Sequence, residues 1–198
     1  EDKVFVFDHY QACATNLHKT AGAFFTPLSF AWEFCLNLEG SNRIIDLCAG
    51  IGVLSFTALQ RDPQRELVCI EINPEYVKAG KKLVPEATWR CMDVMDTESL
   101  LQLGEFDAAI SNPPFANVET FKDKKSPTYT GAKSEYKVID IASQLALWGF
   151  FILPQNSTPF HYSGVQYYKL VNNFAYQKFH EQTGFEINIG VSIDTAII

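Results

Sequence analysis

The chain has 198 residues, of which 47% are hydrophobic and 20% are charged. This length and composition exclude a disordered or fibrous protein and predict one domain with a sizeable core. The 23 acidic residues outnumber the 16 basic ones, which gives a net charge of −7. A generally basic nucleic-acid-binding protein is therefore excluded, and any polyanionic partner must meet a local basic patch.

The cysteines are scattered, without a CxxC pair or a Cys/His cluster; they are Cys13, Cys35, Cys48, Cys69 and Cys91. This pattern predicts reduced, buried thiols in a cytosolic protein and no metal site. No apolar run approaches the ~18 residues of a membrane-spanning helix. The first residues do not resemble a signal peptide. We therefore expect a cytoplasmic protein that does not contact a membrane.

The predicted elements alternate between strand and helix along most of the chain. A first helix is expected from Pro27 to about Leu38. Strands are then predicted at 43–47, 66–72, 87–92, 106–111, 149–153 and 186–191, and helices at 50–60, 74–84, 134–147 and 165–183. The strands are nearly continuous apolar runs, which is typical of a parallel sheet covered on both faces. The pattern therefore predicts a doubly wound α/β fold.

Three features at the ends of predicted strands favour a nucleoside ligand. The segment Asp46–Gly52 (DLCAGIG) joins the first strand to a helix, and its glycines let the backbone approach a ligand closely. Ser55 occupies the third glycine position of a dinucleotide fingerprint, which argues against NAD. Glu71 could accept hydrogen bonds from ribose hydroxyls, and Asp93 from an adenine amino group while Val94 packs against the ring. The simpler interpretations are a tight turn, a solvated carboxylate and a helix cap.

The segment 111–115 (SNPPF) indicates the chemistry most clearly, because it directly follows the apolar strand FDAAI. Pro113 and Pro114 fix the backbone and remove two N–H donors. Carbonyl oxygens and the Asn112 amide oxygen are then left to accept hydrogen bonds from an amino group. Phe115 offers a flat face on which a planar group can stack.

Together these motifs resemble the class I S-adenosylmethionine-dependent methyltransferases, and most closely the N6-adenine DNA methyltransferases with an NPP(Y/F) motif. The segment Gly22–Pro27 (GAFFTP) is similar to the cofactor motif that this family carries upstream of its glycine turn. The resemblance covers about residues 20–155. It implies a mostly parallel, seven-stranded Rossmann-like sheet. We expect a single catalytic domain, with the upstream cofactor motif and helix at 20–42 and the core at 43–198.

The resemblance implies S-adenosylmethionine as the methyl donor and S-adenosylhomocysteine as the product. Thr26 would bind the carboxylate of the methionine, Glu71 would hold the ribose and Ile72 would pack against the adenine. Asp46, Cys48 and Gly50 would line the methionine and ribose side. The implied cofactor-binding residues are Phe25, Thr26, Pro27, Asp46, Cys48, Ala49, Gly50, Gly52, Glu71, Ile72, Asp93, Val94 and Asn112.

The expected reaction is methyl transfer to an exocyclic amino nitrogen, with adenine N6 in DNA favoured. Asn112 Oδ1 and the Pro113 carbonyl would accept hydrogen bonds from both N–H groups of the amine and direct its lone pair at the methyl group. A base flipped out of the duplex would stack on Phe115. Asn112, Pro113, Pro114 and Phe115 are therefore the predicted catalytic residues.

No separate target-recognition domain is expected, because few residues follow the catalytic motif. The loop after the motif carries the lysines Lys122, Lys124, Lys125, Lys133 and Lys137. Basic and aromatic residues together suit a nucleic-acid contact, and we predict that Lys122, Lys124, Lys125 and Tyr129 bind the substrate. A solvated surface loop is the alternative. The stretch 154–164, with His161, is a second candidate, and a partner subunit or oligomer could also supply recognition.

Other substrates use similar chemistry. RNA adenine-N6, cytosine-N4 and protein glutamine-N5 methylation remain open, although the glutamine enzymes usually carry a sizeable helical domain before the glycine turn. A cofactor-binding subunit without activity is a further alternative, against which the intact NPPF argues. The small size suggests a solitary enzyme from a bacterium or its virus.

Overall fold

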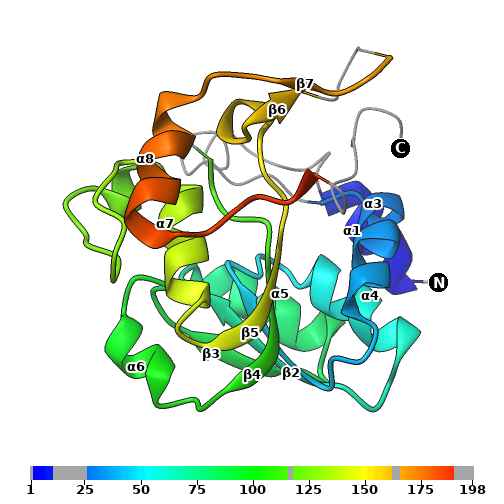
Figure 1. The fold of residues 1–198 in the computed structure, drawn as a ribbon. Helices are drawn as coiled ribbons and strands as arrows, with labels where there is room; N and C mark the ends of the chain where they lie inside the picture. The colour runs from blue at the N-terminus through cyan, green and yellow to red at the C-terminus, as the bar shows by residue number, and fades with distance from the viewer. Residues whose placement is uncertain (1, 11–25, 116–117, 162–165, 190–198) are drawn as a thin grey trace.

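The computed structural model describes residues 2–10, 26–115, 118–161 and 166–189. Its centre is a five-stranded sheet in the order β3-β2-β1-β4-β5 (Figure 1). The strands are β1 (Arg43–Leu47), β2 (Glu66–Glu71), β3 (Thr88–Cys91), β4 (Phe106–Ser111) and β5 (Ala146–Phe151). All neighbouring strands are parallel. The chain therefore changes direction across the sheet between β1 and β4, where open α/β sheets bind ligands.

Helices cover both faces of this sheet. They are α1 (Asp2–Tyr10), α3 (Leu28–Phe34), α4 (Val53–Arg61), α5 (Pro74–Leu83), α6 (Thr97–Leu101), α7 (Ser134–Ala142) and α8 (Phe174–Thr183). Short 3-10 turns lie at η1 (Cys35–Leu38), η2 (Glu119–Phe121) and η3 (Gln155–Ser157), and an antiparallel hairpin joins β6 (Phe160–His161) to β7 (Lys169–Leu170).

The two faces of the sheet hold separate apolar cores, because successive strand residues point to opposite faces. Ile44 packs with α1, α3, α4 and α5, whereas its neighbour Ile45 packs with α6 and α7. None of the helices in the described part of the chain is long and apolar enough to cross a membrane.

Local sequence explains where the helices next to the strand ends begin. The Asn73 side chain accepts a hydrogen bond from the Glu75 backbone N–H at 3.0 Å and caps α5, and Pro74 occupies the first helical position. Gly52 precedes α4 with φ of +91°, and a Cβ there would lie 2.9 Å from the indole of Trp89. Glycine is therefore required at this turn by both its backbone and its surroundings.

The predicted α/β fold with a parallel sheet is confirmed, but a seven-stranded sheet is not: the parallel sheet has five strands in the described residues, and β6 and β7 form a separate antiparallel pair. The prediction of strand at 186–191 is wrong for 186–189, and 190–191 lie outside the described residues. The helix expected at 134–147 ends at Ala142, because the apolar run that starts at Ala146 pairs with β4.

The late helix, expected at 165–183, begins only at Phe174. The side chain of Asn173 accepts a hydrogen bond from the Tyr176 backbone N–H at 3.1 Å and caps its first turn, a signal that the sequence analysis overlooked. Cys91, expected to be buried, is exposed because β3 is an edge strand of the sheet. Cys35 and Cys69 are buried as predicted, while Cys13 lies outside the described residues.

Candidate active site

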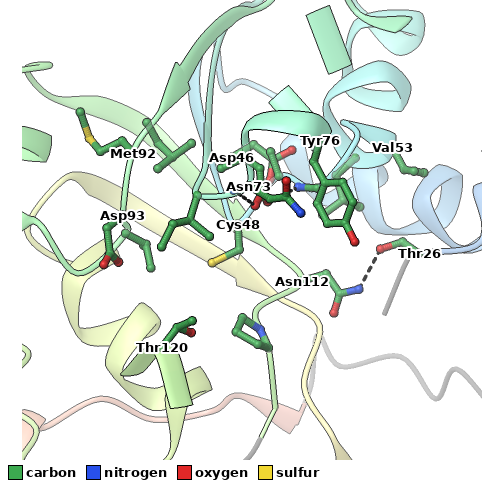
Figure 2. A pocket seen from close by; sticks show the side chains of 18 of the residues that line it. Thr26, Asp46, Cys48, Val53, Asn73, Tyr76, Met92, Asp93, Asn112 and Thr120 are labelled. Carbon is green, nitrogen blue, oxygen red and sulfur yellow. Dashed lines mark hydrogen bonds between the residues drawn. The ribbon is translucent and has the colours of Figure 1, made fainter. Parts of the chain in front are cut away.

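A pocket lies where the parallel strands end (Figure 2). Its walls come from the glycine turn after β1, from the ends of β2 and β3, from the segment after β4 and from η2. The lining residues are Thr26, Asp46, Cys48, Ala49, Gly50, Val53, Leu54, Ile70, Glu71, Ile72, Asn73, Tyr76, Met92, Asp93, Val94, Asn112, Pro114, Thr120 and Phe121. Most of the predicted cofactor residues are therefore brought together. Pro27 and Gly52 are not among the lining residues, and Phe25 lies outside the described residues.

The glycine turn is held against the end of β2. The Ala49 N–H donates to the Ile70 carbonyl at 2.9 Å, and the Gly50 N–H donates to Glu71 Oε2 at 2.8 Å. Cys48 adopts φ of +63°, a left-handed conformation that costs a residue with a side chain about 1–2 kcal/mol. Burial, with the charges of Glu71 and Asp46, raises the pKa of the Cys48 thiol. Cys48 is therefore a neutral thiol that lines the pocket, and it is not activated as a nucleophile.

Glu71 joins the glycine turn to α5. Its Oε1 accepts the Asn73 N–H at 2.8 Å while Oε2 accepts the Gly50 N–H. Burial raises the pKa of Glu71, and these backbone N–H groups oppose that effect. Since each carboxylate oxygen has two acceptor sites, Glu71 can still accept hydrogen bonds from a ligand hydroxyl.

Asp46 is a buried carboxylate with one oxygen unsatisfied. Its Oδ2 accepts the Ser55 hydroxyl at 2.6 Å, whereas Oδ1 has no hydrogen-bond partner among the described residues. Burial raises the pKa of Asp46 to about 7, the charge of Glu71 adds to the effect, and the hydrogen bond from Ser55 opposes it. An unpaired acceptor at the pocket wall fits a ligand that donates hydrogen bonds or carries positive charge. Ser55, which argued against NAD in the sequence, holds this carboxylate in place.

Asp93 is engaged by the loop that follows the NPPF motif. Its Oδ1 accepts the Met95 N–H at 2.9 Å, and its Oδ2 forms an ion pair with the Lys124 ammonium. Thr120 and Phe121 from the same loop line the pocket next to Asp93. Lys124, predicted to contact the substrate, is therefore paired with Asp93, a predicted cofactor residue that lines the pocket. No motif in the sequence predicts the ion pair between Asp93 and Lys124.

Asn112 is held by the first predicted cofactor motif. Its Nδ2 donates to Thr26 Oγ1 at 3.0 Å, as the dashed line in Figure 2 shows. This bond uses the donor end of the amide and leaves Oδ1 as the acceptor end. The strand end beneath it is fixed on both sides, because the Ser111 hydroxyl donates to the Leu47 carbonyl and the Ile152 N–H donates to the Ser111 carbonyl. Thr26, expected to bind the cofactor carboxylate, is thus also the support of the predicted catalytic amide.

Two residues of the predicted contact segment are buried, Tyr129 in the loop and Lys137 on α7. Tyr129, predicted to contact the substrate, is only 3% exposed and packs edge-on against Tyr136 and Phe179 with ring centroids 5.5 and 5.6 Å away. In this structure it has no open face for a base. The buried ammonium of Lys137 donates to the carbonyl oxygens of Phe121 and Lys124 at 2.9 and 2.7 Å.

The remaining predicted substrate residues lie nearer the surface. Lys122 and Lys125 are exposed, and Lys122 forms an ion pair with Glu119 at 3.3 Å. Phe115 is half-buried and Pro113 is buried. The basic surface expected along this loop is therefore smaller than the lysine count suggested.

The family model of the methyltransferase small domain matches residues 33–126. Ribosomal RNA small subunit methyltransferase C of Shewanella denitrificans is 40% identical over 79 residues, covering 39% of this chain and 22% of that protein. The tRNA1(Val) (adenine(37)-N6)-methyltransferase of Pseudoalteromonas translucida is 26% identical over 89 residues, covering 44% of this chain and 37% of that protein. The matches thus cover only 22% and 37% of the length of these relatives.

Solved structures share the fold. A proposed RNA methyltransferase from Pyrococcus horikoshii superimposes with a TM-score of 0.52 at 22% identity, over 68% of this chain and 64% of that one. A methyltransferase of Podospora anserina gives a TM-score of 0.51 at 13% identity, over 79% of this chain and 63% of that one. The fold is that of a Rossmann-like methyltransferase. With the match to the methyltransferase small domain, the findings support a class I S-adenosylmethionine-dependent methyltransferase.

Proposed function

We propose that this chain is the catalytic domain of an S-adenosylmethionine-dependent N-methyltransferase that acts on an exocyclic amino group in RNA, with adenine N6 as the favoured target. The observation that carries the proposal is the Asn112 amide, oriented by Thr26 at the rim of the pocket. The DNA target favoured by the sequence is not supported by the comparisons. The RNA alternative fits better, because the relatives are named as methyltransferases of ribosomal and transfer RNA.

Two features of the pocket suit this cofactor: its negatively charged side chains and the unpaired acceptor Asp46 Oδ1. Three carboxylates, Asp46, Glu71 and Asp93, line it together with apolar side chains. When bound, S-adenosylmethionine would supply an electrophilic methyl group on a positively charged sulfur. Asp46 would line its methionine and ribose side, Glu71 would accept from the ribose hydroxyls, and Ile72 and Val94 would pack against its adenine.

The residues after β4 would act on the target amine. Asn112 Oδ1 and the Pro113 carbonyl would accept hydrogen bonds from its two N–H groups. This geometry would turn the nitrogen lone pair out of conjugation with the ring. Phe115 would stack against the base and hold it in place. No strong general base is required, because the amine proton becomes acidic only after the methyl group has been transferred.

Labelled S-adenosylmethionine tests the proposal directly. We would incubate the chain with RNA, DNA and protein extracts and digest each to find the methylated unit. N6-methyladenine in RNA is expected. Asn112→Ala should abolish transfer while calorimetry shows S-adenosylhomocysteine binding within about twofold of wild type, since the amide is a target acceptor. Asn37→Ala, which removes a half-buried amide outside the pocket lining, is the matched control. Label confined to DNA or to protein would refute the RNA assignment.

A further inference from the structure

We propose that the segment 166–174 is a docking surface for a single-stranded stretch of RNA beside the target base. The segment comprises β7 and the connection to α8, and it is called the hairpin surface below. This inference rests on the proposed RNA substrate, and it assigns a recognition surface within the described residues.

Large side chains are exposed along this segment. Tyr167, Leu170 and Phe174 are 74%, 76% and 77% exposed, and Tyr168 is 50% exposed. All residues from 166 to 170 are exposed. Scattered apolar residues are common on surfaces, but several together in one short segment mark a site of interaction. Flat aromatic rings are the side chains on which single-stranded bases stack, without regard to sequence.

The charge around these rings favours a polyanion. No Asp or Glu occurs between Asp140 and Glu181, although the whole chain carries a net charge of −7. Lys169 lies within the hairpin surface and Lys178 on the helix that follows, and both are exposed. A negatively charged strand would therefore meet two lysines and no carboxylate from this stretch of the chain.

The base of the hairpin is held by hydrogen bonds to the segment 156–159, which supports the exposed rings. The Val171 N–H donates to the Pro159 carbonyl at 2.9 Å. The Asn173 side chain donates to the carbonyl oxygens of Asn156 and Thr158 at 3.0 and 3.1 Å. A surface fixed in this way loses little conformational entropy when it binds.

A buried polar cluster ties that support to α7. Ser157 Oγ donates to Glu135 Oε1 at 2.6 Å and lies 2.6 Å from the Lys133 ammonium. The Tyr136 hydroxyl donates to the Ser157 carbonyl at 2.8 Å. Glu135 and Ser157 are fully buried, and none of these bonds involves the exposed rings of the hairpin surface. Substitution of the exposed rings should therefore leave the fold intact.

The hairpin surface and the proposed catalytic segment lie at the same end of the sheet, where the parallel strands finish. β4 and β5 are parallel, so the chain leaves both strands at their neighbouring carboxyl ends. The Ile152 N–H donates to the Ser111 carbonyl at 3.0 Å and holds the two exits together. Figure 1 shows β6 and β7 beyond that edge of the sheet. A strand that places one base at Asn112 could thus continue onto the hairpin surface.

The test measures binding of a fluorescent single-stranded RNA of about 16 nucleotides by anisotropy. Tyr167→Ser and Phe174→Ser, alone and together, should weaken binding by between about 5-fold and 150-fold for each ring. Lys169→Ala should lower the slope of log affinity against log salt by about one. The control is Leu147→Ser with Trp148→Ser, which removes equally exposed apolar groups, 83% and 67% exposed, from the edge strand β5.

Each outcome decides the proposal. Unchanged affinity in the Tyr167/Phe174 double variant or an equal loss in the β5 control would overturn it. A change of oligomeric state in the double variant, seen by sedimentation, would assign the surface to a second copy of the chain instead. If RNA is bound through these rings but never methylated, the proposed function fails and the surface stands. If RNA is methylated with the same KM by the double variant, the surface fails and the function stands.

Discussion

Replacing Asp46 by Asn should change how the stability of this protein depends on pH. The carboxyl is 1% exposed, and burial raises its pKa to about 7 from an ordinary value of 3.8. The folded state therefore binds this proton more tightly than the unfolded chain does. The stability contributed by the protonated carboxyl is fully present below the unfolded pKa, and it is lost as pH rises through the folded pKa.

The difference between the two pKa values sets the magnitude. It corresponds to about 4 kcal/mol in total, of which more than half is lost between about pH 5 and pH 8. Asn is neutral throughout this range and can keep the hydrogen bond from Ser55, which donates to Oδ2 in the native protein. The free energy of unfolding of the native protein, minus that of Asp46→Asn, should therefore fall by about 2 to 3 kcal/mol across this window.

Urea unfolding at a series of pH values measures this difference, with the fluorescence of the buried Trp89 as the probe. Glu39→Gln, at an exposed carboxyl, controls for the loss of one negative charge. A difference between the native protein and Asp46→Asn that stays constant from about pH 5 to pH 8 would refute the reasoning. The Asp46 carboxylate would then be charged, and its unpaired Oδ1 would need another source of stabilisation.

Three further substitutions test the site. Thr26→Val should lower kcat by about 2- to 10-fold, because the Asn112 amide loses one orienting hydrogen bond, and Thr26→Ser, which keeps the hydroxyl, should restore kcat. Gly52→Ala should destabilise the fold by at least about 2 kcal/mol in urea unfolding, since its φ is +91° and a Cβ would meet an indole ring at 2.9 Å. Lys124→Met should tighten S-adenosylhomocysteine binding up to about fivefold in calorimetry, because the ammonium no longer competes for the Asp93 carboxylate. Weaker binding would instead show that Lys124 holds its loop over the ligand.

The pocket could be predicted from the sequence because its residues follow short apolar strands. Asp46, Glu71, Asp93 and Asn112 each stand at or just after a strand end, and parallel strands bring their carboxyl ends to one edge. This argument needs only the local pattern and the direction of the strands. It does not need the order of the strands or any contact between side chains.

The surroundings of Tyr129 could not be predicted in this way. Its neighbours in the chain are polar and basic, which is typical of a solvated loop. Tyr129 is buried because Phe179 of α8, 50 residues further along the chain, packs against it, and because Asp140 accepts its backbone N–H at 2.8 Å. Contacts at such separations depend on how the helices pack against the sheet, and no local sequence pattern predicts them.

The bond between Thr26 and Asn112 shows a further limit and a consequence. Each residue belongs to a motif that the sequence explains by itself, one predicted for the cofactor and one for the target. The two residues are 86 positions apart in the chain, so no local pattern predicts their contact. Pro27, with φ of −58°, fixes the chain directly after Thr26, and its carbonyl accepts the Ala31 N–H at 3.0 Å where α3 begins. The orientation of the Asn112 amide therefore depends on the segment Thr26–Pro27 that precedes α3. If that segment also contacts the cofactor, as the resemblance implies, cofactor binding would steady the acceptor of the target amine, and both substrates would be aligned through one hydrogen bond.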